Sequence, residues 1–204
     1  MILVFSRTGE RRYTVEAQRP GLPHLLMNPA PGYDPLMPHD MMHMVVEAQL
    51  GLRNGIFGQL AAGGNAGTFH LPMKNGDSAR QIARTRRRVA ARGKKLLRVG
   101  RDECGQSERA AFICWQEWRA RSSSRDRGKL SGALNQGKLD EICEHLDELS
   151  SHWFRLTVGQ SMAVSWPDLA IVSTSDAPPC SSAEGKHQRH DANTPQQKLN
   201  DHNQ

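Results

Sequence analysis

The sequence predicts an α+β fold, in which a small antiparallel sheet packs against four or five helices. Three observations predict it: a β-prone hairpin at residues 1–19, a strongly periodic helix at 138–154, and an alternating run at 161–166. The chain has 204 residues, of which 37% are hydrophobic and 24% are charged. That composition fits one hydrophobic core rather than two, so we expect a single domain over residues 1–172.

The N-terminal residues are expected to form a β-hairpin. Ile2 to Phe5 is a β-prone run, and Tyr13 to Ala17 alternates apolar and polar residues after a turn that contains Gly9. A short third strand within residues 22–27 is restricted to the edge of the sheet. The reason is Pro23, because proline cannot donate a hydrogen bond to a neighbouring strand.

An apolar helix is expected from Pro38 to Gly51. Proline suits the first turn of a helix, where its missing N–H would have no partner. Asp40 would interact with the unpaired amides of that turn. Gly51 can end the helix, because glycine adopts the left-handed conformation found after many helices. A second, short helix is expected from Arg53 to Ala62.

A strongly basic helix is expected next. Asp77 or Ser78 can cap its start, and Gly93 is expected to interrupt it. Residues 80–101 contain ten Lys or Arg and no acidic residue, so this segment accounts for most of the formal net charge of +6. The rest of the chain is close to neutral.

Two further helices and a strand complete the predicted domain. Ser107, together with Glu108, is expected to open a helix that runs to about Arg121. The apolar residues of the helix at 138–154 recur at three- and four-residue spacing and form one face: Leu139, Ile142, Cys143, Leu146, Leu149 and Trp153. The strand at 161–166 is stopped by Pro167. Residues 173–204 contain too few apolar side chains to offset their ordering entropy, so we expect a disordered tail.

The composition also bears on where in the cell the protein is expected. No stretch approaches the roughly 20 apolar residues that cross a membrane. The apolar run at the N-terminus is short and has no basic residues before it, unlike a signal peptide. The four cysteines form no C-x-x-C pair, which indicates reduced thiols rather than a disulfide framework. We expect a cytoplasmic protein that does not associate with membranes.

The most distinctive polar pattern lies at the start of the apolar helix. His39 and His43 are four residues apart, so on a helix they share a face, about 40° and 6 Å from each other. Two imidazoles with this spacing can bind one zinc ion. Asp40 occupies the position that a glutamate holds in the H-E-x-x-H zinc helix, where a carboxylate activates metal-bound water. Glu47 is placed to orient His43 from outside the metal's ligand set.

The sequence therefore predicts a zinc (Zn²⁺) site with hydrolytic potential at His39 and His43, with Asp40 and Glu47 as candidate catalytic residues. A third ligand must come from elsewhere, and His145 is the first candidate. The other candidates are Glu144, His70 and His24. An alternative interpretation is that the two histidines form hydrogen bonds within a folded helix and bind no metal.

The basic segment predicts a different function, binding of nucleic acid or of an acidic partner protein. The residues expected to contact phosphates are Arg80, Arg84, Arg87, Arg88, Lys94, Lys95 and Arg98. The segment lacks aromatic residues between the basic ones, and its apolar residues fit a packed helix whose basic side faces solvent. The acidic helix at 138–154, packed alongside, would also balance this charge.

Several of these segments together resemble a set of uncharacterised bacterial proteins. The shared features are the RTGERR hairpin, the PHD-x-x-H-x-x-x-E helix followed by GLRNGIFGQLAAGG, and the closing W-x-x-L-x-V-G-x-S segment with its Trp-Pro. The similarity covers residues 1–64 and 139–167. It implies no activity. It does imply that the first and last strands belong to one small antiparallel sheet.

Overall fold

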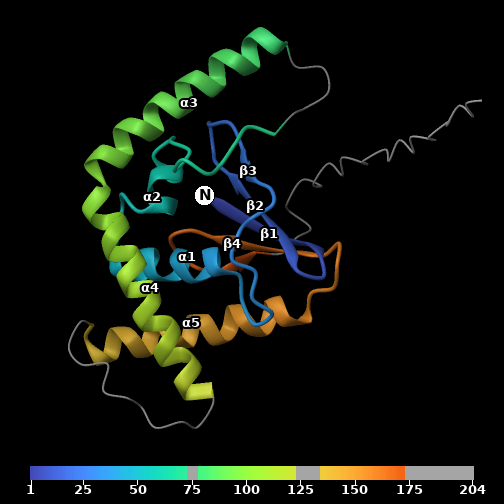
Figure 1. Ribbon diagram of the computed structural model, residues 1–204. Coiled ribbons are helices and arrows are strands. Elements are labelled where there is room, and N and C mark those ends of the chain that lie inside the picture. The colour runs from blue at the N-terminus through green and yellow to red at the C-terminus, as the bar shows by residue number, and fades with distance from the viewer. Residues whose placement is uncertain (73–77, 123–133, 173–204) are drawn as a thin grey trace, which may run out of the picture.

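The computed structural model describes residues 1–72, 78–122 and 134–172, and this part of the chain has an α+β fold (Figure 1). Its strands are β1 (Ile2–Gly9), β2 (Arg12–Gln18), β3 (Leu25–Met27), β4 (Ser161–Ser165) and β5 (Ile171–Val172). Its helices are α1 (His39–Leu50), α2 (Ile56–Ala61), α3 (Ala79–Val99), α4 (Arg101–Ser122) and α5 (Gln136–Arg155). The predicted disordered tail, 173–204, lies outside the described residues.

The five strands form one antiparallel sheet in the order β3-β2-β1-β4-β5. β1 lies in the middle, where Phe5 is paired with Val15 of β2 on one side and Met162 of β4 on the other. The predicted hairpin is confirmed, and so is the expectation that the first strand and the strand at 161–166 share a sheet. β5 was not expected from the sequence.

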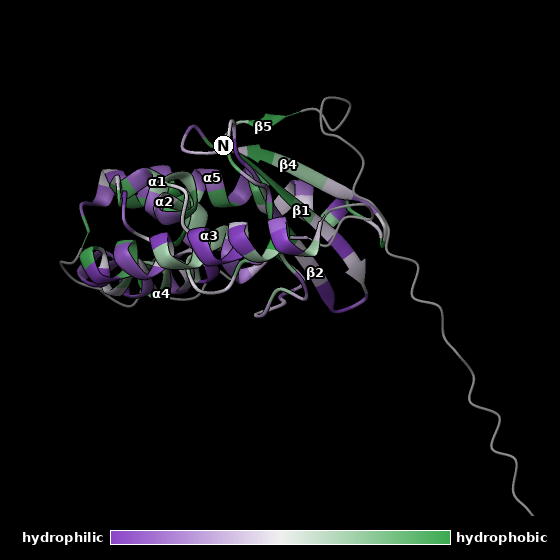
Figure 2. Ribbon diagram, turned by 90° about the horizontal axis from the view of Figure 1, so that it is seen from above, coloured by the Kyte–Doolittle hydropathy of each residue, from purple (hydrophilic) through white to green (hydrophobic). Residues whose placement is uncertain are grey.

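One face of the sheet supplies apolar side chains to the core. Because neighbouring strands are in register, alternate residues of every long strand point to the same side. These are Leu3, Phe5, Tyr13, Val15, Ala17, Leu25, Met27, Met162 and Val164, all buried in one cluster with side chains from the helices. Figure 2 shows the sheet on one side of the molecule and the helices on the other.

α1 lies inside this core, and its ends only partly match the expectation. Gly51 ends the helix with a φ of 66°, as predicted. Pro38 lies just before the helix, with φ −56° and ψ 140°, rather than in its first turn. Asp40 lies in the first turn, as expected, and its buried side chain also accepts a hydrogen bond from Tyr13 of β2.

α3 and α4 form a long arc on one side of the molecule (Figure 1). The expected interruption at Gly93 is wrong, since α3 continues to Val99. Gly93 is needed for close packing instead: a Cβ there would lie 2.2 Å from Oδ1 of Asn65. The break comes at Gly100, so α4 begins at Arg101 and Ser107 lies inside the helix rather than at its start.

α5 follows the prediction from the sequence. All six residues of its predicted apolar face are buried, and they pack against α1 and α4. α3, in contrast, packs against α2 and α4, so the expectation that the acidic helix lies alongside the basic one is not met. None of the described helices combines the length and apolarity needed to cross a lipid bilayer.

Three cysteines belong to the described part, and all three are free thiols. Cys114 of α4 and Cys143 of α5 are both buried. Burial raises the pKa of Cys114 to about 12 and that of Cys143 to about 11, so both remain protonated at neutral pH. These two side chains act as small apolar groups in the core.

Candidate metal centre

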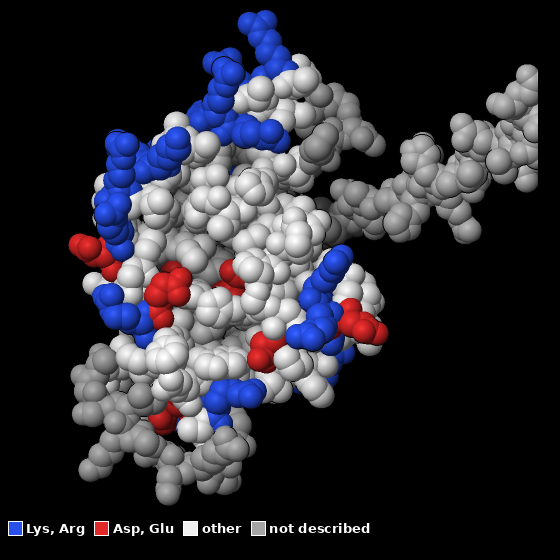
Figure 3. Space-filling view, in the orientation of Figure 1, with Lys and Arg blue, Asp and Glu red and all other residues white. Residues whose placement is uncertain are grey.

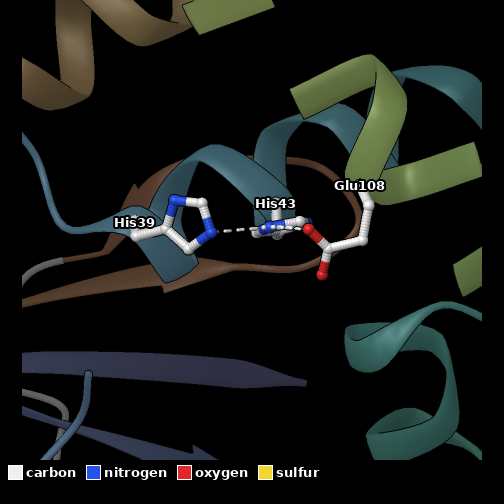
Figure 4. Close-up of side chains that lie close together, drawn as sticks. All are labelled: His39, His43 and Glu108. Carbon is white, nitrogen blue, oxygen red and sulfur yellow. Dashed lines mark hydrogen bonds and ion pairs between the residues drawn. The ribbon is translucent and has the colours of Figure 1, made fainter. Parts of the chain in front are cut away.

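His39 and His43 point toward one another from successive turns of α1 (Figure 4). Their Nε2 atoms are 3.0 Å apart, and the rings meet edge to face with centroids 4.6 Å apart. His43 is buried, with 2% of its surface exposed, whereas His39 is exposed. The expected shared face is therefore present, and it opens to solvent at the His39 end.

Glu108 of α4 adds a carboxylate to this pair. Its Oε2 lies 3.6 Å from Nε2 of His43, and Figure 4 shows the side chain reaching the pair from the neighbouring helix. The three ligand atoms all lie within 4.8 Å of one another. The side chain of Glu108 is 67% exposed, so the group lies at the protein surface. Two imidazole nitrogens and one carboxylate oxygen could hold a metal ion here.

Two of the three separations are close to those found in a metal site. Ligand atoms about 2.0–2.1 Å from a tetrahedral ion are about 3.3 Å from each other. Nε2 of His43 lies 3.0 Å from Nε2 of His39 and 3.6 Å from Oε2 of Glu108, and these distances lie on either side of that value.

Burial keeps His43 in its neutral form. Desolvation lowers the pKa of His43, Glu108 partly opposes this with its negative charge, and His39 adds to the lowering. A histidine must be neutral to bind a metal, because the imidazolium has no free lone pair. The imidazole of His43 is therefore in the protonation state that a ligand requires.

Behind His43 lies a buried chain of hydrogen bonds that involves Ser107 and Glu47. Nδ1 of His43 is 2.9 Å from Oγ of Ser107, and that hydroxyl donates to Oε1 of Glu47 at 3.0 Å. The carboxylate of Glu47 also accepts hydrogen bonds from the backbone N–H groups of Ile56 and Phe57, both at 2.8 Å. Glu47 is thus linked to His43 through Ser107, at the start of α2.

The position of Glu47 depends on Gly55, the residue just before α2. A Cβ on Gly55 would lie 2.3 Å from Cδ of Glu47, so only glycine leaves room for the carboxylate. Glu47 has no exposed surface, and this burial raises its pKa to about 7 in spite of the hydrogen bonds that it accepts.

The two carboxylates expected to be catalytic, Asp40 and Glu47, are both outside the group of ligand atoms. Asp40 follows His39 by about 100° around α1, so it points to the sheet, where it accepts a hydrogen bond from Tyr13. Burial raises the pKa of Asp40. Glu47 supports His43 from behind, which agrees with the expected orienting role and not with direct contact to a metal.

The expected third ligand, His145, is not part of this group in the described residues, and neither are the other three candidates. His145 lies on α5 outside its buried face. His24 is 3.1 Å from Glu16. His70 forms a backbone bridge with Leu26. The acidic side chain that lies close to the two histidines is Glu108.

Sequence reasoning missed both Ser107 and Glu108. A serine followed by an acid is typical of a helix start, so the pair indicated a cap. Because α4 in fact begins at Arg101, Ser107 and Glu108 lie next to each other inside the helix and not at its start. In that position Ser107 can bond to His43, and Glu108 can offer a carboxylate to the candidate metal site.

The seven basic residues predicted to bind phosphates all lie on α3 and are all exposed. Figure 3 shows Lys and Arg side chains gathered over this helix. None of the seven forms an ion pair within residues 1–72, 78–122 and 134–172. At about 100° per residue, they fall within an arc of about 120° on the side opposite Val89 and Gly93, which are buried.

Comparison of the chain with protein-family models, with curated proteins and with solved structures gives no match. The function is therefore inferred from the geometry of the chain's own residues.

Proposed function

We propose that this protein binds a zinc ion through Nε2 of His39, Nε2 of His43 and a carboxylate oxygen of Glu108. The observation that carries the proposal is the convergence of these three atoms from two helices. Nε2 of His43 and Oε2 of Glu108, 3.6 Å apart, are too far from each other for a direct hydrogen bond. A cation between them would interact favourably with both. Two histidines and one carboxylate form a ligand set typical of catalytic zinc.

Such a site would leave a fourth tetrahedral position for water. His39 and Glu108 are both exposed, so that position would face solvent and a substrate could reach it. Zinc lowers the pKa of bound water to about 7 and so provides hydroxide at neutral pH. This is the basis of the hydrolytic potential that we propose. The bond that is cleaved is not specified by these residues.

Metal analysis of the purified protein tests the proposal. After loading with zinc and dialysis, the wild type should retain one equivalent. His39→Ala, His43→Ala and Glu108→Gln should each lose most of it, with unchanged circular dichroism. His145→Ala is the matched control, because it removes a histidine outside the group and should retain the zinc. A wild type without zinc, or equal zinc in all variants, would contradict the proposal.

A second candidate function is binding of nucleic acid by α3. The observation in its favour is the exposed basic face, which has no ion pair within the described part of the chain. The helix of 21 residues is about 31 Å long, enough to follow a phosphate backbone over several nucleotides. Each phosphate neutralised would release counterions, so the affinity should fall steeply with salt.

A salt titration of binding to DNA or RNA tests this second function. Replacing Arg87 and Arg88 by Ala should reduce the slope of log affinity against log salt by about 1.4–1.8. The matched control is Arg11→Ala with Arg12→Ala, two adjacent exposed arginines around the β1–β2 turn. No binding at low salt would rule out nucleic acid and leave an acidic protein as the partner to test.

A further inference from the structure

The strongest unassigned feature is the buried chain of hydrogen bonds from Glu47 through Ser107 to His43. We infer that Glu47 and Ser107 are positioning residues that hold His43 with its proton on Nδ1. The lone pair of Nε2 is then directed at the proposed metal position. The consequence for metal affinity depends on the zinc site proposed above, whereas the position of the proton does not.

At Glu47, backbone donors define the direction of the hydrogen bonds. Backbone N–H groups can only donate, and those of Ile56 and Phe57 point to Oε1 and Oε2, respectively. Above the pKa of about 7 Glu47 is ionised, so both of its oxygens can then only accept. The carboxylate is completely buried and held at the start of α2, so it cannot turn away from these donors.

The next step follows from the single hydrogen of a serine hydroxyl. Ser107 donates that hydrogen to Oε1 of Glu47, at 3.0 Å. Toward His43 the same oxygen can only accept, so the contact of 2.9 Å requires a proton on Nδ1 of His43. Ser107 is 1% exposed, which leaves little room for water to replace it as a partner.

The last step concerns Nε2, the other ring nitrogen of His43. A neutral imidazole carries one proton, so a proton on Nδ1 leaves Nε2 as a lone pair. This atom faces Nε2 of His39 at 3.0 Å and Oε2 of Glu108 at 3.6 Å. Without metal, His39 donates its Nε2–H to His43. To hold a metal, Nε2 of His39 would have to give up its proton, whereas Nε2 of His43 would already be free.

This arrangement makes His43 the preorganised ligand of the three. α1 carries the ring, α4 carries the hydroxyl, and the start of α2 fixes the carboxylate. Partners that fix the tautomer of a ligating histidine typically change metal affinity by about 10–100-fold. Ser107→Ala should therefore weaken zinc binding by that factor without removing any ligand.

Nitrogen-15 NMR of the metal-free wild type at about pH 8 tests the inference directly, since protonated and unprotonated ring nitrogens resonate far apart. We expect Nδ1 of His43 to be protonated and Nε2 to be unprotonated. A proton on Nε2, or a doubly protonated ring, would overturn the inference. This measurement needs no variant, so it remains decisive even if replacement of Ser107 disturbs folding.

Zinc titrations of variants give the second readout. Ser107→Ala should bind zinc about 10–100-fold more weakly and show a mixture of His43 tautomers. Ser107→Thr, which keeps the hydroxyl, should restore the zinc affinity and the single tautomer of His43. Ser150→Ala is the matched control, because Ser150 is also a helical serine but bonds to the backbone oxygen of Leu36, away from the histidines. Equal affinities for wild type and Ser107→Ala would overturn the positioning role.

The two proposals can fail separately. A wild type that binds no zinc but has its His43 proton on Nδ1 would refute the metal site and support the positioning of the proton. A wild type that binds zinc with the proton of His43 on Nε2 before loading would support the metal site and overturn the inference.

Discussion

The hydroxyl of Tyr13 on β2 donates a buried hydrogen bond to the carboxyl group of Asp40 on α1. The ring of Tyr13 also packs edge to face on Trp153 of α5, with centroids 6.0 Å apart. One side chain therefore connects the sheet to both central helices. Because Asp40 follows His39 directly, this contact fixes the start of the helix that carries the candidate ligands.

Tyr13→Phe should destabilise the fold by about 1–3 kcal/mol, because it leaves the buried carboxyl group of Asp40 without its partner. The ring packing on Trp153 would be kept. The measurement is the free energy of unfolding in urea. Tyr33→Phe is the control, since Tyr33 is half-buried and its hydroxyl accepts from Arg7. A loss for Tyr13→Phe no larger than for the control would show that the contact is energetically unimportant.

Glu47 should make the stability of the metal-free protein depend on pH. Its pKa is about 7 in the fold, against an ordinary value of 4.5. Because the fold favours the neutral acid, the associated stability is fully present below about pH 4.5. It is lost as the pH rises through about 7. The shift corresponds to about 3 kcal/mol.

Urea unfolding of the wild type and Glu47→Gln at about pH 4.5 and about pH 8 measures this effect. The amide does not titrate, so between the two pH values the wild type should lose about 3 kcal/mol relative to the variant. Other titrating groups are shared by both proteins and cancel in the difference. A difference that is the same at both pH values would show that Glu47 has an ordinary pKa.

Zinc should stabilise the wild type against heat. At free zinc about 100 times the dissociation constant, linkage predicts about 2.7 kcal/mol. For a chain of this size, that corresponds to a rise in Tm of about 5–10 °C. His39→Ala should show no rise. Magnesium should have little effect on either protein, since it prefers oxygen ligands. A zinc shift that persists in His39→Ala would place the ion elsewhere.

Gly55→Ala should disturb the support behind His43. The φ of Gly55 is −66°, which any residue can adopt, so the effect comes only from the contact of the new methyl group with Glu47. We expect the free energy of unfolding to fall by about 1–3 kcal/mol, as at other overpacked sites. Gly105→Ala is the control. Gly105 lies in α4 beside the guanidinium end of Arg109, and its replacement by alanine should raise the free energy of unfolding by about 0.5–1 kcal/mol.

The elements predicted well from the sequence are those specified by local patterns. The buried face of α5 follows from residue spacing alone, and Gly51 ends α1 because its own conformation allows it. His39 and His43 also belong to this class, since helix geometry alone brings residues four apart onto one face. Each of these features needs no knowledge of any other part of the chain.

The third side chain of the candidate site could not be predicted in this way, because it depends on which helices meet. His145 was expected on account of its residue type, but α4 brings Glu108 to the histidines. Gly93 shows the same limit. Glycine often ends a helix, and here it serves to admit Asn65 against a helix that continues. In both cases the deciding contact joins residues far apart in the sequence.

β1, the central strand of the sheet, pairs with one strand that is close to it in the sequence and with one that is far from it. β2 follows β1 after a tight turn, whereas β4 pairs Ser165 with Ile2 from the far end of the described chain. During synthesis on the ribosome, one edge of β1 therefore stays unpaired until the chain has emerged as far as Ser165. Such long-range pairing slows folding, and an open apolar strand edge invites aggregation until β4 arrives.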